Sequence, residues 1–250
     1  MYMRMVQVKV KPGQLDTLRR HYQDRVIPAL AGVVGCRYAG LMKSVHHEEE
    51  CISLTLWDSE EGSSAYERSG LFEALLRETR PYLLESTESK LQLSEDLTLE
   101  SVPIPEEPVV SGLPVAARSD ELSPLKQQRG PGWVRIVSLR LRPGKREEFE
   151  RLYRENVIPI LRSLRGCSSI YLSERFDRAD EVISVTSWDS KADAEAYERS
   201  GLFMRLLESQ KDALSELYQW KFDNANAGLT VTSEDTTVEY FDVVAGKAFT

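Results

Sequence analysis

The chain has 250 residues, of which 41% are hydrophobic and 29% are charged, and charged or turn residues interrupt its apolar runs, so the composition predicts a globular protein without a membrane-spanning segment. The formal net charge of −8 argues against nucleic acid and anionic membranes as partners, because both bind through clustered cationic charge. Three cysteines, an odd number, do not make a disulfide framework, and the alternating pattern starts directly at Met1, so we expect a cytoplasmic protein.

The first predicted elements are a strand, a helix and a two-stranded hairpin. Residues 2–10 alternate as a strand does. From Leu15 to about residue 31, apolar residues recur at three- and four-residue spacing, which indicates an amphipathic helix, and Pro28 predicts a kink in its last turns. Residues 36–43 and 51–57 predict the two strands of the hairpin.

Two helices and a last strand are predicted to follow the hairpin. A short helix runs from the capping residues Asp58 and Ser59 to Arg68, a second covers 71–84, and residues 90–99 supply the strand. This order is the split βαβ pattern of a ferredoxin-like α+β domain, whose antiparallel sheet carries helices on one face only. The other face of the sheet must therefore be buried against something else.

Residues 103–131 are expected to be a linker. They contain six prolines among serine, glycine and charged residues, with no sustained period. A flexible coil of about 30 residues spans on the order of 30 Å, so it would let the flanking segments dock face to face.

The segment after the linker repeats the segment before it. Trp57 aligns with Trp188 at an offset of 131 residues, and the run at 66–72 recurs unbroken at 197–203. Each copy is long enough for its own core, so we predict two domains, 1–102 and 132–250. In the C-terminal extension of the second, residues 236–244 could add an edge strand. The second copy is the expected cover for the open face of the first, with approximate two-fold symmetry.

Both copies carry a pattern that resembles a known family. A strand ends in Trp-Asp-Ser, a tyrosine follows nine residues after that tryptophan, and Ser-Gly-Leu-Phe opens the next helix. This resembles the antibiotic biosynthesis monooxygenase family of the dimeric α+β barrel superfamily. The resemblance implies two ferredoxin-like domains whose antiparallel sheets form an intramolecular pseudo-dimeric barrel, and it leaves further self-association open. It does not specify a reaction, because that superfamily contains several unrelated activities.

Strand parity defines a predicted pocket in each copy. Side chains of one parity share a face, and each first strand places an arginine on an otherwise mostly apolar face: Tyr2, Arg4, Val6, Val8 and Val10, matched by Trp133, Arg135, Val137, Leu139 and Leu141. The strand that ends in tryptophan adds Ser53, Thr55 and Trp57, or Ser184, Thr186 and Trp188. The helices can contribute Tyr22 and Tyr66, or Tyr153 and Tyr197. If these faces point toward the helices, as the resemblance implies, each domain encloses a cavity for an aromatic or hydrophobic small molecule.

Each of these residues also has a purely structural interpretation. A tryptophan at a strand end can plug the core, serine and threonine are common strand residues, and an arginine at a strand start can reach the rim. The functional interpretation makes Arg4 and Arg135 anchors for a carboxylate or enolate. The recurrence of an arginine on an otherwise mostly apolar face in both copies is the observation that favours the functional interpretation.

The resemblance suggests a chemistry and leaves an alternative. Cofactor-free oxygenases of this family act on phenolic or enolic substrates whose anions react directly with oxygen, so no cofactor or metal is expected. Trp57, Arg4 and Arg77 are then the catalytic candidates, although Ser53 and Ser184 stand where relevant members have asparagine, and Glu208 takes the place of Arg77 in the second copy. The alternative is a non-catalytic module that binds a hydrophobic metabolite or a partner protein.

Two other site types are disfavoured. Haem degraders of the family need an asparagine and a histidine at positions that hold Val6 and Leu76 here, and Val137 and Leu207 in the second copy. The acidic and histidine-containing run at 46–50 looks like a metal cluster, but it lies on the hairpin loop and is not repeated, so a solvated loop is expected.

Overall fold

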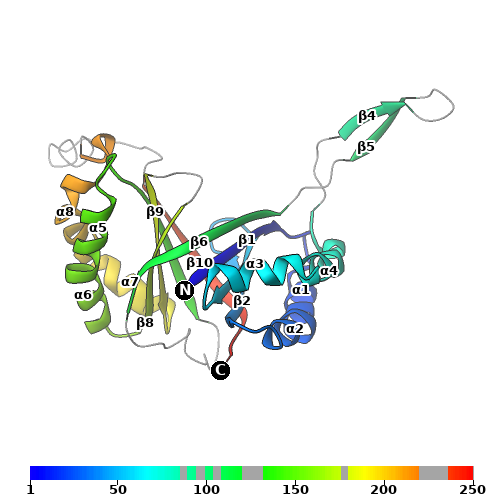
Figure 1. Ribbon diagram of the computed structural model, residues 1–250, viewed down its shortest axis with the longest axis horizontal. Helices are drawn as coiled ribbons and strands as arrows, with labels where there is room; N and C mark the ends of the chain where they lie inside the picture. The colour runs from blue at the N-terminus through cyan, green and yellow to red at the C-terminus, as the bar shows by residue number, and fades with distance from the viewer. Residues whose placement is uncertain are drawn as a thin grey trace.

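The computed structural model describes residues 1–84, 89–93, 99–103, 108–119, 132–175, 180–219 and 236–249. Eight antiparallel strands close into a barrel, and the helices of each half pack on its outside (Figure 1). The strand order around the barrel is β1-β3-β2-β10-β7-β9-β8-β6. No helix in the described ranges is long and apolar enough to cross a membrane.

The two halves contain matching elements. The first half consists of β1 (Tyr2–Lys9), α1 (Leu15–His21), α2 (Ile27–Ala31), β2 (Cys36–Ser44), β3 (Glu50–Trp57), α3 (Glu60–Arg68) and α4 (Leu71–Thr79). The second half consists of β7 (Trp133–Arg140), α5 (Arg146–Leu152), α6 (Ile158–Ser163), β8 (Cys167–Glu174), β9 (Glu181–Trp188), α7 (Lys191–Arg199) and α8 (Leu202–Glu208). The predicted α+β architecture of two ferredoxin-like units in one barrel is confirmed.

The halves are joined by exchanging their last strands. Strand β6 (Val109–Arg118) pairs with β1 of the first half and with β8 of the second. Strand β10 (Thr236–Ala248) pairs in the same way with β7 and β2. Both strands have a bulge at equivalent places, between Val115 and Ala117 and between Val243 and Ala245. The duplication therefore extends to these strands, and each half completes the sheet of the other.

Four sequence-based expectations need correction. The strand expected at 236–244 is not an edge strand, because β10 pairs on both sides, with β2 and with β7. The range 103–131 contains the barrel strand β6, whose alternation the surrounding prolines hide; Pro114 is tolerated because it lies beside the bulge. Residues 90–99 do not supply the last strand of the domain: β4 (Ser89–Leu93) pairs with β5 (Leu99–Pro103) in a separate two-stranded sheet that extends away from the barrel (Figure 1). The helix predicted at 71–84 ends as an α-helix at Thr79, because a tighter turn containing Pro81 follows.

The first helix of each half has a wide turn before its proline. Between α1 and α2, the turn Tyr22–Val26 is a π-helix, in which the Ile27 amide donates to the Tyr22 carbonyl. Because Pro28 has no N–H to continue the α-helical pattern, the extra residue in this turn accommodates its ring. The predicted kink is thus a π turn, and it recurs at Tyr153–Val157 before Pro159.

Alternate residues of each barrel strand face different cores. On β1, Met3 and Met5 pack inside the barrel, whereas Arg4, Val6 and Val8 face the helices. The molecule therefore has one core in the barrel lumen and one between the sheet and the helices of each half. The two helix-side layers are where the sequence places its candidate residues.

Candidate functional site

The first half has a small cavity between β1, β3 and the helices. Its volume is about 70 Å³, and its lining is mostly aliphatic and aromatic. The polar lining side chains are those of Arg4, Tyr22, Ser53, Thr55, Tyr66 and Thr79. The strand parity inferred from the sequence is therefore correct, and five of the predicted residues border one cavity.

Among the described residues that line this cavity, Arg4 has the only charged side chain. It is 5% exposed, and its Nη1 donates to Glu67 Oε2 over 2.9 Å. The guanidinium carbon lies 4.4 Å from the centroid of the Phe72 ring, which covers it. Neither Nε nor Nη2 of Arg4 has a hydrogen-bond partner among the described residues. A buried guanidinium with two donor nitrogens free of protein partners has the chemistry to bind an anionic oxygen.

The acid that neutralises Arg4 lies outside the cavity. The Glu67 side chain is 54% exposed, and the hydrogen bond from Arg4 holds the pKa of its carboxyl below the usual range. Glu67 therefore remains ionised at neutral pH and supplies a counter-charge from the solvent side. Arg4 itself belongs to the cavity lining, and its Nε and Nη2 take no part in this ion pair.

Two hydrogen bonds fix three of the remaining polar side chains, those of Tyr22, Ser53 and Thr55. Tyr22 Oη and Ser53 Oγ are 2.9 Å apart, and burial raises the pKa of Tyr22, so its phenol stays protonated. Trp57 Nε1 donates to Thr55 Oγ1 over 2.9 Å. These contacts leave the tyrosine and serine hydroxyls as one coupled pair facing the apolar wall.

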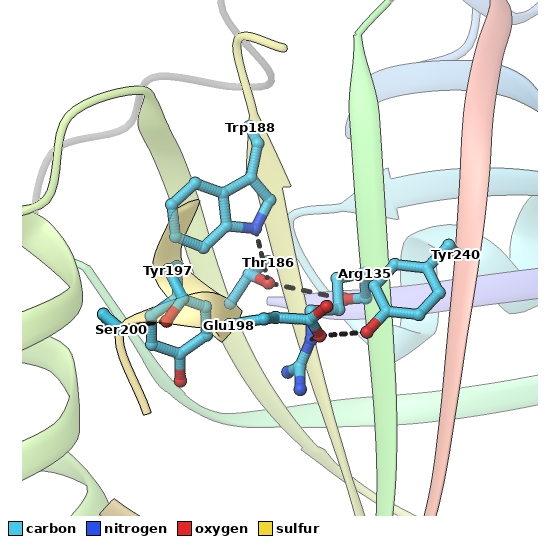
Figure 2. A network of polar contacts seen from close by, with 7 residues as sticks. All are labelled: Arg135, Thr186, Trp188, Tyr197, Glu198, Ser200 and Tyr240. Atoms are coloured by element: carbon cyan, nitrogen blue, oxygen red, sulfur yellow. Dashed lines mark hydrogen bonds and ion pairs between the residues drawn. The ribbon is translucent and has the colours of Figure 1, made fainter. Parts of the chain in front are cut away.

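The second half repeats the arrangement with a smaller cavity, of about 30 Å³. Arg135 is 3% exposed and its Nε donates to Glu198 Oε1 over 3.0 Å, while Phe203 covers the guanidinium at 4.0 Å. The Tyr240 hydroxyl from β10 donates to the same carboxylate (Figure 2). Nη2 of Arg135 is buried without a hydrogen-bond partner among the described residues.

The polar pairs of the first half recur in the second. Tyr153 Oη and Ser184 Oγ are 2.6 Å apart. Trp188 Nε1 donates to Thr186 Oγ1 over 3.1 Å (Figure 2). Tyr197 lines the cavity and stacks on Trp188. The two sites thus share a framework and differ in volume and in the number of unused arginine donors.

The two tryptophans lie behind the cavities. Trp57 and Trp188 are fully buried, and neither belongs to the lining of the described cavities. Trp57 stacks on Tyr66 with a centroid distance of 5.1 Å. The geometry therefore fits the structural interpretation, in which each tryptophan plugs the core and holds a lining tyrosine and threonine in place.

Arg77 does not meet the cavity. It is exposed on α4, and its neighbour Leu76 lines the cavity instead. The suggested oxyanion role of Arg77 consequently has no support in the geometry. Glu208, its counterpart on α8, is also exposed.

Sequence reasoning missed the residues that hold each arginine. Glu67 and Phe72 pair with and cover Arg4, and Glu198 and Phe203 do the same for Arg135. The sequence did contain a signal for these residues, because two of them lie in the run at 66–72 and the other two in its unbroken repeat at 197–203. Tyr240 had no such signal, because Gly112 occupies the equivalent place in β6.

The positions relevant to haem and metals are apolar or scattered. Val6 and Leu76 line the first cavity, and Val137 and Leu207 line the second, so these positions offer no axial ligand. Among the described residues, no three histidine, cysteine or acidic side chains gather in a way that could hold a metal ion.

Comparisons with known proteins agree with the fold. The family model described as antibiotic biosynthesis monooxygenase matches twice, at residues 1–78 and 133–208. No curated protein sequence matches significantly.

Among solved structures, a candidate monooxygenase from Lactobacillus acidophilus has a TM-score of 0.66 at 8% identity, covering 99% of this chain and 95% of that one. A candidate monooxygenase from Fusobacterium nucleatum has a TM-score of 0.66 at 10% identity and covers 99% and 94%. An anthrone oxidase-like protein has a TM-score of 0.54 at 13% identity and covers 99% and 92%. At these identities, the likeness concerns the fold.

Proposed function

Because this chain belongs to the antibiotic biosynthesis monooxygenase family, we propose that its first half is a cofactor-independent monooxygenase site for an aromatic or polyketide-like small molecule that ionises to an enolate or phenolate. The observation that carries the proposal is Arg4, a buried guanidinium with two unused donors on the wall of an apolar cavity. An anion bound there exchanges its hydration shell for fixed donors in a dry environment.

The proposed reaction balances without an external reductant. The substrate loses a proton, and its enolate carbon adds to one atom of O₂ to form a peroxide at that carbon. The peroxide takes up the proton, the O–O bond breaks with loss of the second C–H proton, and the products are a ketone and water. All four electrons that reduce O₂ come from the substrate carbon and its two C–H bonds.

Arg4 would act by lowering the pKa of the bound substrate. No carboxylate or imidazole belongs to the lining of the described cavity, so the substrate must ionise without a general base in direct contact. A cation in a low-dielectric cavity favours the ionised form of a nearby enol. The best substrates are therefore those with acidic enols or phenols, such as anthrones.

Substrate entry requires the cavity to open. Ligand pockets usually measure about 300–1,000 Å³, and this cavity measures about 70 Å³. Phe72, which covers Arg4 from the first turn of α4, lines the cavity and is partly exposed, so its displacement would enlarge the space beside Arg4. An outward shift of α4 would enlarge it further.

A non-catalytic binding module is the second candidate. The absence of a base from the described lining and the small volume of both cavities favour it. In that case Arg4 would still hold an anionic group, and no oxygen would be consumed.

Oxygen uptake separates the two candidates. The full chain is mixed with a panel of anthrones and catechols, and uptake is measured together with product formation and with binding by calorimetry. The monooxygenase proposal expects one O₂ consumed for each ketone formed. Saturable binding of a panel member without uptake would support the binding module and refute the enzyme.

A further inference from the structure

The barrel lumen is open at one end and forms a cavity of about 770 Å³. Its floor is made of buried apolar side chains, namely Met5, Ile52, Leu113, Ile136 and Ile183. The interior of an eight-stranded barrel is wide enough either to be filled by side chains or to hold one small ligand. This volume falls within the usual range of ligand pockets, about 300–1,000 Å³, which neither helix-side cavity reaches.

The lining comes from equivalent positions in both copies. Aligned residues meet across the cavity in the pairs Met5 and Ile136, Gln7 and Ser138, and Ile52 and Ile183. The exchanged strands add Ser111 from β6 and Glu239 from β10, which hold matching registers against β1 and β7. The cavity therefore lies on the pseudo-two-fold axis, and neither half forms it alone.

The two halves contribute unequal volumes to the lumen. Val134 stands where the first half has Met3, and Ser173 stands where it has Met42. Ser173 is fully buried, and its hydroxyl has no hydrogen-bond partner among the described residues. Two identical subunits would impose two-fold symmetry on such a cavity, whereas the duplicated chain can shape it for a single asymmetric ligand.

The charged groups at the mouth favour a cation. Arg140 Nε lies 3.5 Å from Asp180, and Arg175 Nη1 lies 3.5 Å from Glu181, so both arginines already have acidic partners. Glu239 faces the lumen, is partly buried, and has no ion pair with any described residue. Of the four charged residues in the lining, Glu239 is therefore the one without an ion pair among the described residues.

The groups around Glu239 also favour the binding of a cation. Burial and the nearby Glu50 raise the pKa of the Glu239 carboxyl, and the smaller influence of His46 and His47 on the adjoining hairpin lowers it. An adjoining hollow of about 380 Å³ shares Gln7, Ile52, Val109 and Glu239 with the lumen and provides a route to solvent. A protonated amine at this place would relieve the repulsion between the two carboxylates.

We propose that the barrel lumen is a second binding site, separate from the helix-side cavities, and that it takes one amphiphilic amine. The apolar chain of the ligand packs between Met5, Ile136 and Leu113. Its ammonium group lies at the mouth against Glu239.

Calorimetry of the full chain with octylamine, octanol and octanoate tests this proposal. One molecule of octylamine is expected to bind per chain, more tightly than octanol, while octanoate binds least. Glu239→Gln should weaken octylamine binding roughly tenfold, which corresponds to about 1.4 kcal/mol, and leave octanol binding unchanged. The matched control Glu73→Gln, at an exposed position of α4, should change neither. Equal affinities for the three probes, or tighter binding of octanoate, would overturn the proposal.

Two further variants test whether octylamine binds in the barrel lumen or in the helix-side cavity. Ser111→Phe fills the lumen and should abolish octylamine binding, with circular dichroism and the thermal midpoint checking the fold. Arg4→Met alters only the helix-side cavity and should leave octylamine binding intact. Loss of binding in Arg4→Met with retention in Glu239→Gln would place the probe in the wrong cavity and contradict the assignment.

Discussion

At the residue scale, each arginine is held in an unequal ion pair. The guanidinium of Arg4 is buried, whereas most of the Glu67 side chain meets solvent. The free-energy cost of desolvation is therefore almost entirely that of the Arg4 guanidinium. The ion pair with Glu67 offsets only part of this cost. A hydrophobic side chain would fill the same space without desolvating a charge, so the ion pair is weak evidence for a role in stability and agrees with the binding role proposed for Arg4.

Because Arg4 is buried and Glu67 is mostly exposed, we expect substitutions of the two residues to change the free energy of unfolding by different amounts. Arg4→Met should change the free energy of unfolding by less than about 1 kcal/mol, because the Glu67 carboxylate that remains is solvated. Glu67→Ala should destabilise by about 2–3 kcal/mol, because it leaves a buried guanidinium without a counter-charge. Urea unfolding of both variants measures the difference. Equal destabilisation would show that the pair acts as an ordinary structural salt bridge.

Buried thiols and phenols predict a loss of stability in alkaline solution. Burial raises the pKa of Cys36 and Cys51 to about 12 and also raises the pKa of Tyr22 and Tyr153. Above pH ~9 the unfolded chain begins to release these protons while the folded chain keeps them. The stabilising contribution is therefore complete below the unfolded pKa and is lost as the pH rises toward the folded value.

Urea unfolding at a series of pH values from about 8 to 10.5 checks this expectation. The unfolding midpoint should fall steadily over that interval. Cys36→Ala combined with Cys51→Ala should reduce the slope, because two of the linked protons are removed. A midpoint independent of pH would contradict the assignment of these groups as buried and protonated.

At the element scale, the central strands and the helix order could be read from the sequence, and the last strand could not. The parity of β1 and the hydrophobic spacing from Leu15 are local signals, and both proved correct. Strand β6 pairs with partners more than 100 residues away in one direction, and its one proline and one glycine suggest a loop. Only the tertiary pairing identifies it, because its stability comes from cross-strand contacts rather than from local propensity.

The hairpin formed by β4 and β5 should be dispensable. It pairs only within itself among the described strands, so removing it leaves every barrel strand with both neighbours. Replacing residues 89–103 with a Gly/Ser linker of equal length should shift the thermal midpoint by no more than about 2 °C. The matched deletion of β6, residues 109–118, should instead prevent folding. Similar losses for both deletions would show that the hairpin supports the barrel.

At the scale of the whole molecule, duplication has produced a barrel with unequal halves. The repeat and the two-fold arrangement were evident from aligned motifs such as Trp57 and Trp188. The differences that separate the two cavities were only partly evident. The sequence showed that Arg77 aligns with Glu208, but both are exposed, and the asymmetry lies instead in cavity volume and in the contact from Tyr240.

The asymmetry supports the proposal that the ligand binds in the first half. Its cavity is the larger of the two helix-side cavities, and two buried nitrogens of Arg4 lack a partner among the described residues, against one of Arg135. In the second half, the Glu198 carboxylate accepts hydrogen bonds from both Arg135 and Tyr240 (Figure 2). Arg135 thus serves as a natural matched control for Arg4.

The most direct test is oxygen uptake by the full chain with an anthrone, compared between Arg4→Met and Arg135→Met. We expect Arg4→Met to lower kcat/KM by about a hundredfold or more, the effect of losing one oxyanion donor in a desolvated site, while Arg135→Met retains most of the activity. Uptake that survives in Arg4→Met and disappears in Arg135→Met, or that is equally affected by both, would contradict an oxygenase site centred on Arg4.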